Sequence, residues 1–258
     1  MLYNTEAIVT KSVRYGENDA IVTLMTPTGR VSLMARSAMK PQSRLAAGVR
    51  LCAQGTYFIY QGRGMGKLQQ VDLMASRRRL HENLDSAAYA AYFCELLLAA
   101  APERPQADPA MYRQFIGLLD ALIARPQDAE LLARIWEAKI CAWLGVSPDW
   151  RLCVRCGRPL AGPLRYHVQE GGILCRDCLQ STDYNRAFAV PEATAKILHL
   201  FERAVFEKLG KMNISVATTR ALKQTLFYQL TEFAGLSLKS RDILHHLLDA
   251  TVDEEGRS

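Results

Sequence analysis

Acidic side chains are scarce in the first 80 residues of this 258-residue sequence. Residues 1–80 hold 12 Lys and Arg against 4 Asp and Glu, a net charge of +8, whereas the whole chain carries +6. The few acids also lie far apart in the sequence, which argues against the paired carboxylates of a two-metal nuclease. A basic segment of this kind favours a polyanionic partner, either nucleic acid or an anionic surface.

The motifs that mark common enzyme classes are also missing. The sequence has no G-x4-G-K-[ST] phosphate-binding loop, no H-E-x-x-H zinc-protease motif and no G-x-S-x-G nucleophile elbow. Nothing in the pattern of residues therefore indicates ATP hydrolysis, metal-dependent proteolysis or serine hydrolase chemistry. We predict that the protein is not an enzyme.

Long hydrophobic runs are absent as well. No apolar stretch reaches the ~18 residues needed to span a bilayer. The N-terminal stretch MLYNTEAIVTKSV lacks the apolar core and the small-residue cleavage site of a secretory signal. With 49% hydrophobic and 22% charged residues, the composition is typical of a globular protein. We expect a cytoplasmic location and no membrane partner.

Residues 1–80 are predicted to form a small nucleic-acid-binding β-barrel. Short runs rich in β-branched and aromatic residues alternate with turn signals such as Pro27-Thr28-Gly29, and they cover residues 6–13, 20–26, 29–35, 49–61 and 66–74. Five strands in ~75 residues with hairpin-like connections suit an OB-fold. A curved SH3-like barrel is the nearest alternative.

Residues 81–258 are predicted to form a helical domain, so the fold class is α+β. Apolar residues recur here at three- and four-residue spacing, and capping residues, prolines and glycines stand at the ends of the periodic runs. The expected helices cover residues 86–101, 110–124, 129–145, 192–209, 216–234 and 241–250.

Four cysteines form the most specific motif of the chain: Cys153, Cys156, Cys175 and Cys178, in the pattern C-x2-C-x18-C-x2-C. Two tight turns of this kind present four sulfurs to one ion, which predicts a Zn²⁺ site in a zinc ribbon at residues 148–184, inserted in the helical domain. An iron–sulfur cluster also uses four thiolates, but this spacing favours zinc. A closed shell of four sulfurs has no open position for substrate, so we expect a structural metal.

The basic residues of the predicted barrel are candidates for DNA contact, because OB-folds hold single strands with basic loops and aromatic faces. Several of these residues stand in expected turns. The candidates are Arg14, Arg30, Arg36, Lys40, Arg44, Arg63, Lys67 and Arg77.

The order of a basic barrel, helices, a four-cysteine ribbon and further helices resembles the RecO family, the bacterial recombination mediators of the RecFOR pathway. The stretches YGENDAIVTLMTPTGRVSLMARS (15–37) and YFIYQGRGMGKLQQVDL (57–73) carry the resemblance together with the cysteine quartet. It implies a nucleoid-associated protein of DNA repair and the SOS response. Such a protein binds single- and double-stranded DNA, anneals strands coated by single-strand-binding protein, and helps RecR to load RecA.

The resemblance also implies that the helical part receives the acidic, apolar C-terminal tail of the single-strand-binding protein. Arg113, Arg134 and Lys139 lie on amphipathic helices and are the expected basic rims of the groove for this tail. One departure concerns the stretch after the third strand, where Ala38 and Met39 interrupt the basic residues that family members carry there. An RNA-binding or transcription-associated zinc-ribbon adaptor remains the alternative, because single-stranded RNA would suit the same barrel.

Overall fold

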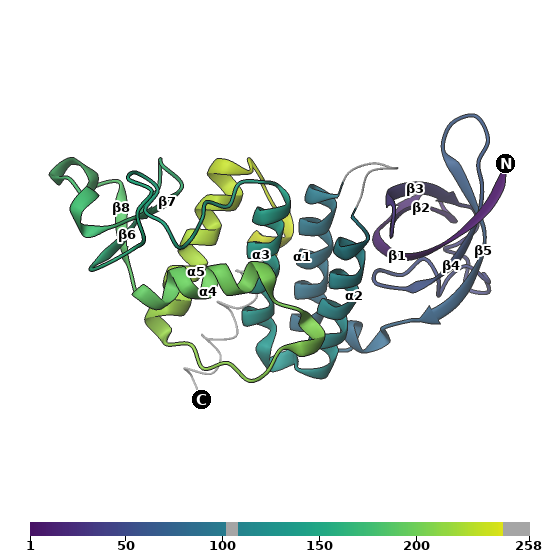
Figure 1. Cartoon of the computed structure of the whole chain (residues 1–258). Coiled ribbons are helices and arrows are strands. Elements are labelled where there is room, and N and C mark those ends of the chain that lie inside the picture. The colour runs from purple at the N-terminus through teal and green to yellow at the C-terminus, as the bar shows by residue number, and fades with distance from the viewer. Residues whose placement is uncertain (102–107, 245–258) are drawn as a thin grey trace. The chain divides into compact units, whose positions relative to one another are not determined.

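The computed structural model describes residues 1–101 and 108–244 (Figure 1). The chain divides into two compact units. The first unit comprises residues 1–129 together with the chain from Leu238 onward, and the second comprises Glu130–Ser237. The chain thus leaves the first unit once, builds the second unit from one continuous segment, and returns.

Five strands of the first unit close into a barrel in the order β1-β2-β3-β5-β4. Every neighbouring pair is antiparallel except β3 and β5, which run parallel. This topology confirms the predicted OB-fold. The fourth strand begins at residue 54, later than the predicted 49, because residues 36–53 form a succession of turns. The strands are β1 (Leu2–Tyr15), β2 (Asp19–Thr26), β3 (Gly29–Ala35), β4 (Gln54–Tyr60) and β5 (Gly66–Ala75).

The barrel core follows from the two-residue period of its strands. Ala20, Val22 and Leu24 alternate along β2 and are fully buried. Tyr57 is also buried in this core, and its hydroxyl has partners there: its one proton is shared between the backbone oxygens of Gly48 and Ala53, at 2.9 and 3.0 Å. Burial raises the pKa of Tyr57 above its usual range, so this hydroxyl remains a donor.

Two helices of the first unit begin at capping side chains. Asn83 accepts a hydrogen bond from the backbone of Ser86 and starts α1 (Leu84–Ala100), two residues before the predicted start. Asp108 caps α2 (Pro109–Ala124), which begins one residue before the predicted start at 110. The predicted last helix is helical from residue 239 to residue 244, and residues 245–250 lie outside the described part of the chain.

The second unit combines helices with a small sheet in the order β7-β6-β8. The helices are α3 (Ala129–Trp143), α4 (Glu192–Arg203) and α5 (Val216–Tyr228), and a π-helical turn (Gln229–Phe233) continues α5. The strands are β6 (Leu164–His167), β7 (Gly172–Leu174) and β8 (Ala187–Val190). The sheet therefore extends beyond residue 184, the predicted end of the ribbon.

The helix predicted for residues 192–209 is shorter than expected. It ends at Arg203, and the backbone is extended at Ala204 and Val205. This break brings Phe206 into the core, where its ring centroid lies 6.2 Å from that of Trp136. Within the described residues, no helix combines the length and the apolar character needed to cross a membrane.

Candidate metal centre and nucleic-acid interface

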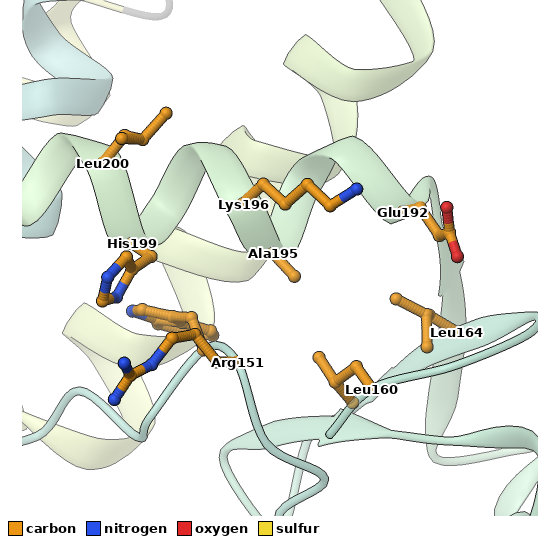
Figure 2. Close-up of a pocket in the computed structure, with 9 residues that line it drawn as sticks. Arg151, Leu160, Leu164, Glu192, Ala195, Lys196, His199 and Leu200 are labelled. Atoms are coloured by element: carbon orange, nitrogen blue, oxygen red, sulfur yellow. The ribbon is translucent and has the colours of Figure 1, made fainter.

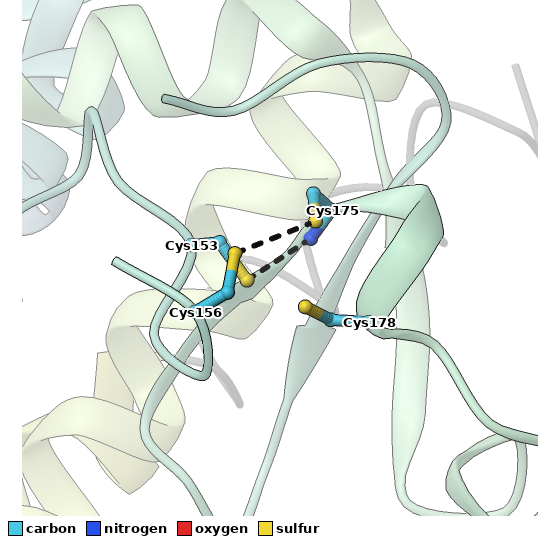
Figure 3. Close-up of side chains that lie close together, drawn as sticks. All are labelled: Cys153, Cys156, Cys175 and Cys178. Carbon is cyan, nitrogen blue, oxygen red and sulfur yellow. Dashed lines mark hydrogen bonds between the residues drawn. The ribbon is translucent and has the colours of Figure 1, made fainter. Parts of the chain in front are cut away.

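The four cysteines of the motif converge in the second unit (Figure 3). Their Sγ atoms all lie within 4.8 Å of one another, and those of Cys156 and Cys175 are 4.0 Å apart. Four sulfurs bound to one Zn²⁺ at ~2.3 Å would be about 3.8 Å apart. The quartet could therefore hold a metal ion with small adjustments of the side chains.

Two backbone turns place these sulfurs. The amide of Gly157 donates to the carbonyl oxygen of Cys153 at 2.9 Å, and Gly157 adopts a φ of 68°, which favours glycine. In the second turn, the amide of Cys178 donates to the carbonyl oxygen of Cys175 at 3.1 Å. The amide of Cys175 also donates to the Sγ atom of Cys153 at 3.5 Å, as the dashed line in Figure 3 marks.

Hydrogen bonds give the thiols different acidities. The backbone N–H and the guanidinium of Arg158 lower the pKa of Cys156 to about 6, because both stabilise its thiolate. The hydrogen bond with Cys156, followed by desolvation, raises the pKa of Cys178 to about 12. Thiolate is the form that ligates metals, and a bound cation deprotonates a coordinating thiol. The quartet is thus a donor set for a soft or borderline cation.

Arg155, which stands between the first two cysteines, fastens the module. Its guanidinium donates to the backbone oxygen of Cys178 at 2.6 Å and pairs with Asp183 at 2.8 Å and with Glu170. The hydrogen bond from Arg155, followed by that from the amide of Gln180, lowers the pKa of Asp183 to about 2. His167 Nε2 lies 3.5 Å from the same aspartate and is not a member of the cysteine cluster.

The barrel brings three of the predicted DNA-binding residues onto adjoining segments. Arg14 pairs with Ala20, which pairs with Ala35 on the next strand, directly before Arg36. The following loop, which carries Lys40, is joined to the β1–β2 turn by a hydrogen bond from the amide of Met39 to the oxygen of Asn18 at 2.9 Å. Arg14, Arg36 and Lys40 are all exposed.

Three further candidates are exposed at other places on the barrel. Arg44 lies in the turns between β3 and β4, and Arg63 lies in the loop between β4 and β5. That loop is joined to the start of β1, because the terminal amine of Met1 donates to the oxygen of Gln61 at 2.8 Å. Lys67 lies opposite Met34 in the parallel pair.

Arg77 and Arg30 occupy places that do not suit DNA contact. Arg77 is 7% exposed, and its guanidinium binds Asp120 at 3.1 Å and Gln54 at 2.8 Å. Arg77 therefore joins the barrel to α2. Arg30 is half-buried and donates to the backbone oxygen of Leu98 in α1 at 3.1 Å. The DNA surface proposed below omits both residues.

Two of the three predicted partner-binding residues are buried as well. Arg134 is 8% exposed and pairs with Glu137 at 2.9 Å. Lys139 is 5% exposed and donates to the backbone oxygen of Glu202 at 3.1 Å. Burial lowers the pKa of Lys139 to about 8. Only Arg113 is exposed, so these three side chains do not form the rims of one groove.

A groove with an apolar floor lies elsewhere in the second unit, beside α4 (Figure 2). Its volume is about 440 Å³, and its floor includes the buried side chains of Trp150, Leu164 and Ala195. Figure 2 shows Arg151 and His199 together at one end and Glu192 at the other. The prediction missed this α4 groove, although the spacing of Lys196, His199 and the exposed Leu200 on an amphipathic helix was a signal for it.

An OB-fold barrel, followed in the chain by a helical unit with a four-cysteine cluster, places the protein in the class of OB-fold proteins. Comparison with known families narrows the class: residues 1–77 match the model for the N-terminal domain of recombination protein O, and residues 81–242 match that for its C-terminal domain. Together the two matches cover almost the whole chain.

Three relatives, each called DNA repair protein RecO, support the assignment. The Bacillus pumilus (strain SAFR-032) protein is 32% identical over 248 residues, 96% of this chain and 95% of the relative. The Shouchella clausii (strain KSM-K16) protein is 33% identical over 250 residues, with 96% and 95% covered. The Bacillus subtilis (strain 168) protein is 31% identical over 248 residues, again with 96% and 95% covered. The chain belongs to the RecO family, and its function lies in DNA repair and recombination.

Proposed function

We propose that this protein is a recombination mediator. In this proposal the barrel binds single- and double-stranded DNA, and the protein anneals strands coated by single-strand-binding protein and helps RecR to load RecA. The observation that carries the proposal is the group of exposed cations, Arg14, Arg36 and Lys40, on adjoining segments of an OB-fold barrel. Basic OB-folds bind nucleic acid backbones, and the family membership directs this activity to DNA repair.

Annealing requires no covalent chemistry in this mechanism. Two complementary strands repel each other through their phosphates, and a coat protein covers their bases. Cations of the barrel lower the repulsion while both strands are bound, and contact with the tail of the coat protein loosens the coat. The base pairs that then form release more free energy than is lost when the strands leave the barrel or the coat protein. Annealing therefore needs no nucleotide such as ATP.

The test is the annealing of two complementary oligonucleotides that are precoated with bacterial single-strand-binding protein, without ATP. We expect annealing to be much faster with this protein than without it. Tight binding to naked strands without annealing of coated strands would refute the mediator function. Competition between DNA and RNA oligonucleotides of one sequence distinguishes the RNA-binding adaptor, for which RNA would win.

We propose that the cysteine quartet holds one Zn²⁺ ion with a structural role. Cys153, Cys156, Cys175 and Cys178 would be its ligands, and four thiolates leave no position for a substrate. The ion would cross-link the two turns beside a small apolar cluster that includes Leu160, Leu174 and Leu179. Metal analysis of the purified protein should find one zinc per chain, and a fourfold cysteine-to-serine variant should contain none.

We propose further that the α4 groove receives the acidic, apolar tail of the single-strand-binding protein. The buried floor suits apolar side chains, and the exposed Lys196 at the edge suits a carboxylate, whereas Arg151 is already paired with Asp149 at 2.7 Å. Lys196→Glu should weaken the binding of a labelled tail peptide at least tenfold in fluorescence anisotropy. Lys208→Glu, an exposed change in the same unit and outside the groove, is the matched control. Equal affinities of the two variants would place the tail elsewhere.

A further inference from the structure

A second hollow lies in the first unit, between β1 and the turns that connect β3 to β4. Its volume is about 610 Å³, within the ~300–1,000 Å³ range of pockets that hold small ligands. We call it the barrel hollow, and it is lined by Ser12, Ala38, Met39, Lys40, Pro41, Ala46, Val49, Arg50, Leu51 and His81. Of these residues, Lys40 alone was among the predicted DNA contacts.

The barrel hollow has an apolar floor and a cationic edge. Ala38 and Val49 are 1% and 2% exposed and form the floor. Lys40, Arg50 and His81 are exposed at its edge, and no carboxylate is among the lining residues. An anion with a flat apolar part satisfies both halves of such a site, because the cations bind the charge and the floor removes the apolar face from water.

The walls of the hollow are held in place by backbone contacts. The amide of Val49 donates to the oxygen of Leu45 at 3.1 Å, and the His81 ring lies with its Nε2 atom 3.0 Å from the oxygen of Leu51. The amide of Cys52 donates to the oxygen of Val9 in β1 at 2.8 Å, which ties the turns to the barrel. Hydrogen bonds thus hold the segments that form the hollow in fixed positions within the OB unit.

Its position connects it with the exposed cations of the barrel. Lys40 belongs to both, and Met39 forms the hydrogen bond to the β1–β2 turn beside Arg14. A strand that crosses Arg14, Arg36 and Lys40 therefore passes the mouth of the hollow. A nucleotide combines the required parts: a phosphate for Lys40 and Arg50, and a flat base for the floor.

We propose that the barrel hollow accepts one unstacked base of a single DNA strand while Lys40 and Arg50 bind its phosphates. The inference rests on the proposed DNA binding of the barrel and adds a subsite that duplex DNA cannot use, because its bases are paired and stacked. The subsite makes the protein favour single strands over duplex.

Ala46 and Ala47 offer a matched pair for the test. Ala46 lines the hollow, whereas its neighbour Ala47 is exposed outside it. Ala46→Leu, which narrows the hollow without adding charge or an aromatic face, should weaken single-strand binding about five- to tenfold, as expected for the loss of one base contact. Its duplex affinity should stay within about twofold of wild type. Ala47→Leu should change neither affinity.

A second measurement locates the base. A single-stranded oligonucleotide that contains 5-iododeoxyuridine should cross-link on irradiation to peptides that contain Met39 or His81. Cross-links confined to the loop that contains Arg63, or equal single-strand affinities of the two alanine variants, would overturn the subsite and leave DNA binding intact. Failure of the wild type to bind any DNA would instead refute the proposed function and the subsite together.

Discussion

At the scale of single residues, the fate of a cation depends on partners that lie far away in the sequence. Arg77 stands in a run of three arginines, yet its partner Asp120 lies 43 residues away and holds it in the interior. Arg78 and Arg79 remain exposed. Similarly, Lys139 lies on an amphipathic helix, but the oxygen of Glu202, 63 residues away, receives its ammonium. Local patterns cannot anticipate such partners.

Replacement of Arg77 by glutamine should destabilise the first unit without weakening DNA binding. The change removes the charged hydrogen bonds to Asp120 and Gln54, and we expect the free energy of unfolding to fall by about 2 kcal/mol. Urea unfolding measures the loss. Arg79→Gln, an exposed neighbour, should change it by less than about 0.5 kcal/mol. If the Arg77→Gln protein were stable but no longer bound DNA, Arg77 would belong to the DNA-binding surface.

Lys139 predicts a pH dependence of stability. Its pKa is about 8 in the folded protein, because burial disfavours the ammonium, and about 10.4 in the unfolded chain. Between these pH values the unfolded chain holds a proton that the folded protein has lost, so folding is favoured as pH rises. The free energy of unfolding, relative to that of Lys139→Met, should rise by up to ~1.4 kcal/mol per pH unit in this window. If the difference in the free energy of unfolding between the two proteins stayed constant from pH 7 to about 10, burial would not lower the pKa of Lys139.

At the scale of elements, the strands and most helix ends could be predicted, because each depends on neighbours in the sequence. Alternation marked the buried face of β2, and Asp108-Pro109 marked the start of α2. The cysteine cluster could also be predicted from local sequence, since each turn needs only two cysteines and their spacing. The early end of α4 could not be predicted, because it depends on the packing of Phe206 on Trp136. The α4 groove and the barrel hollow could not be predicted either, because each forms where separate segments of the chain meet.

The π-helical turn after α5 contacts the ribbon at Gly171. This glycine has a φ of 64°, and a Cβ atom there would lie 2.5 Å from the Phe233 ring. Gly171→Ala should therefore lower the free energy of unfolding by more than the ~1–2 kcal/mol cost of the left-handed backbone alone. In the double variant with Phe233→Ala, the excess should disappear and the backbone cost should remain. Additive effects in this double-mutant cycle would show that the two residues do not touch.

The cysteine turns should matter for folding more than for DNA binding. Cys153→Ser with Cys175→Ser removes one ligand from each turn, so we expect a lower folded yield and a lower melting temperature. The single-strand affinity of the folded fraction should stay within about twofold of wild type, since the proposed DNA surface lies on the barrel. A fully stable variant that no longer binds DNA would place the ribbon on the nucleic acid.

At the scale of the whole molecule, the affinity for DNA should depend strongly on salt, because residues 1–80 carry an excess of positive charge. If about six cations engage a single strand, the log–log slope of affinity against salt should be about −4, which reduces affinity some hundredfold or more between about 50 and 200 mM salt. Filter binding over this range measures the slope. Neutralising Arg36 and Lys40 together should make the slope shallower by about 1.4. A flat response would exclude phosphate contact as the source of affinity.

The course of the chain through its two compact units has a consequence for how the protein tolerates change. The first unit is left after residue 129 and re-entered at Leu238, where Glu95 accepts hydrogen bonds from the amides of Lys239 and Ser240 at 3.2 and 2.8 Å. The intervening segment, Glu130–Ser237, thus begins and ends at the first unit. Residues 130–237 can therefore be lengthened, shortened or replaced in evolution without a change in the path of any strand of the barrel. The module that contains the four cysteines lies between α3 and α4 in the sequence and is in turn inserted within this second segment.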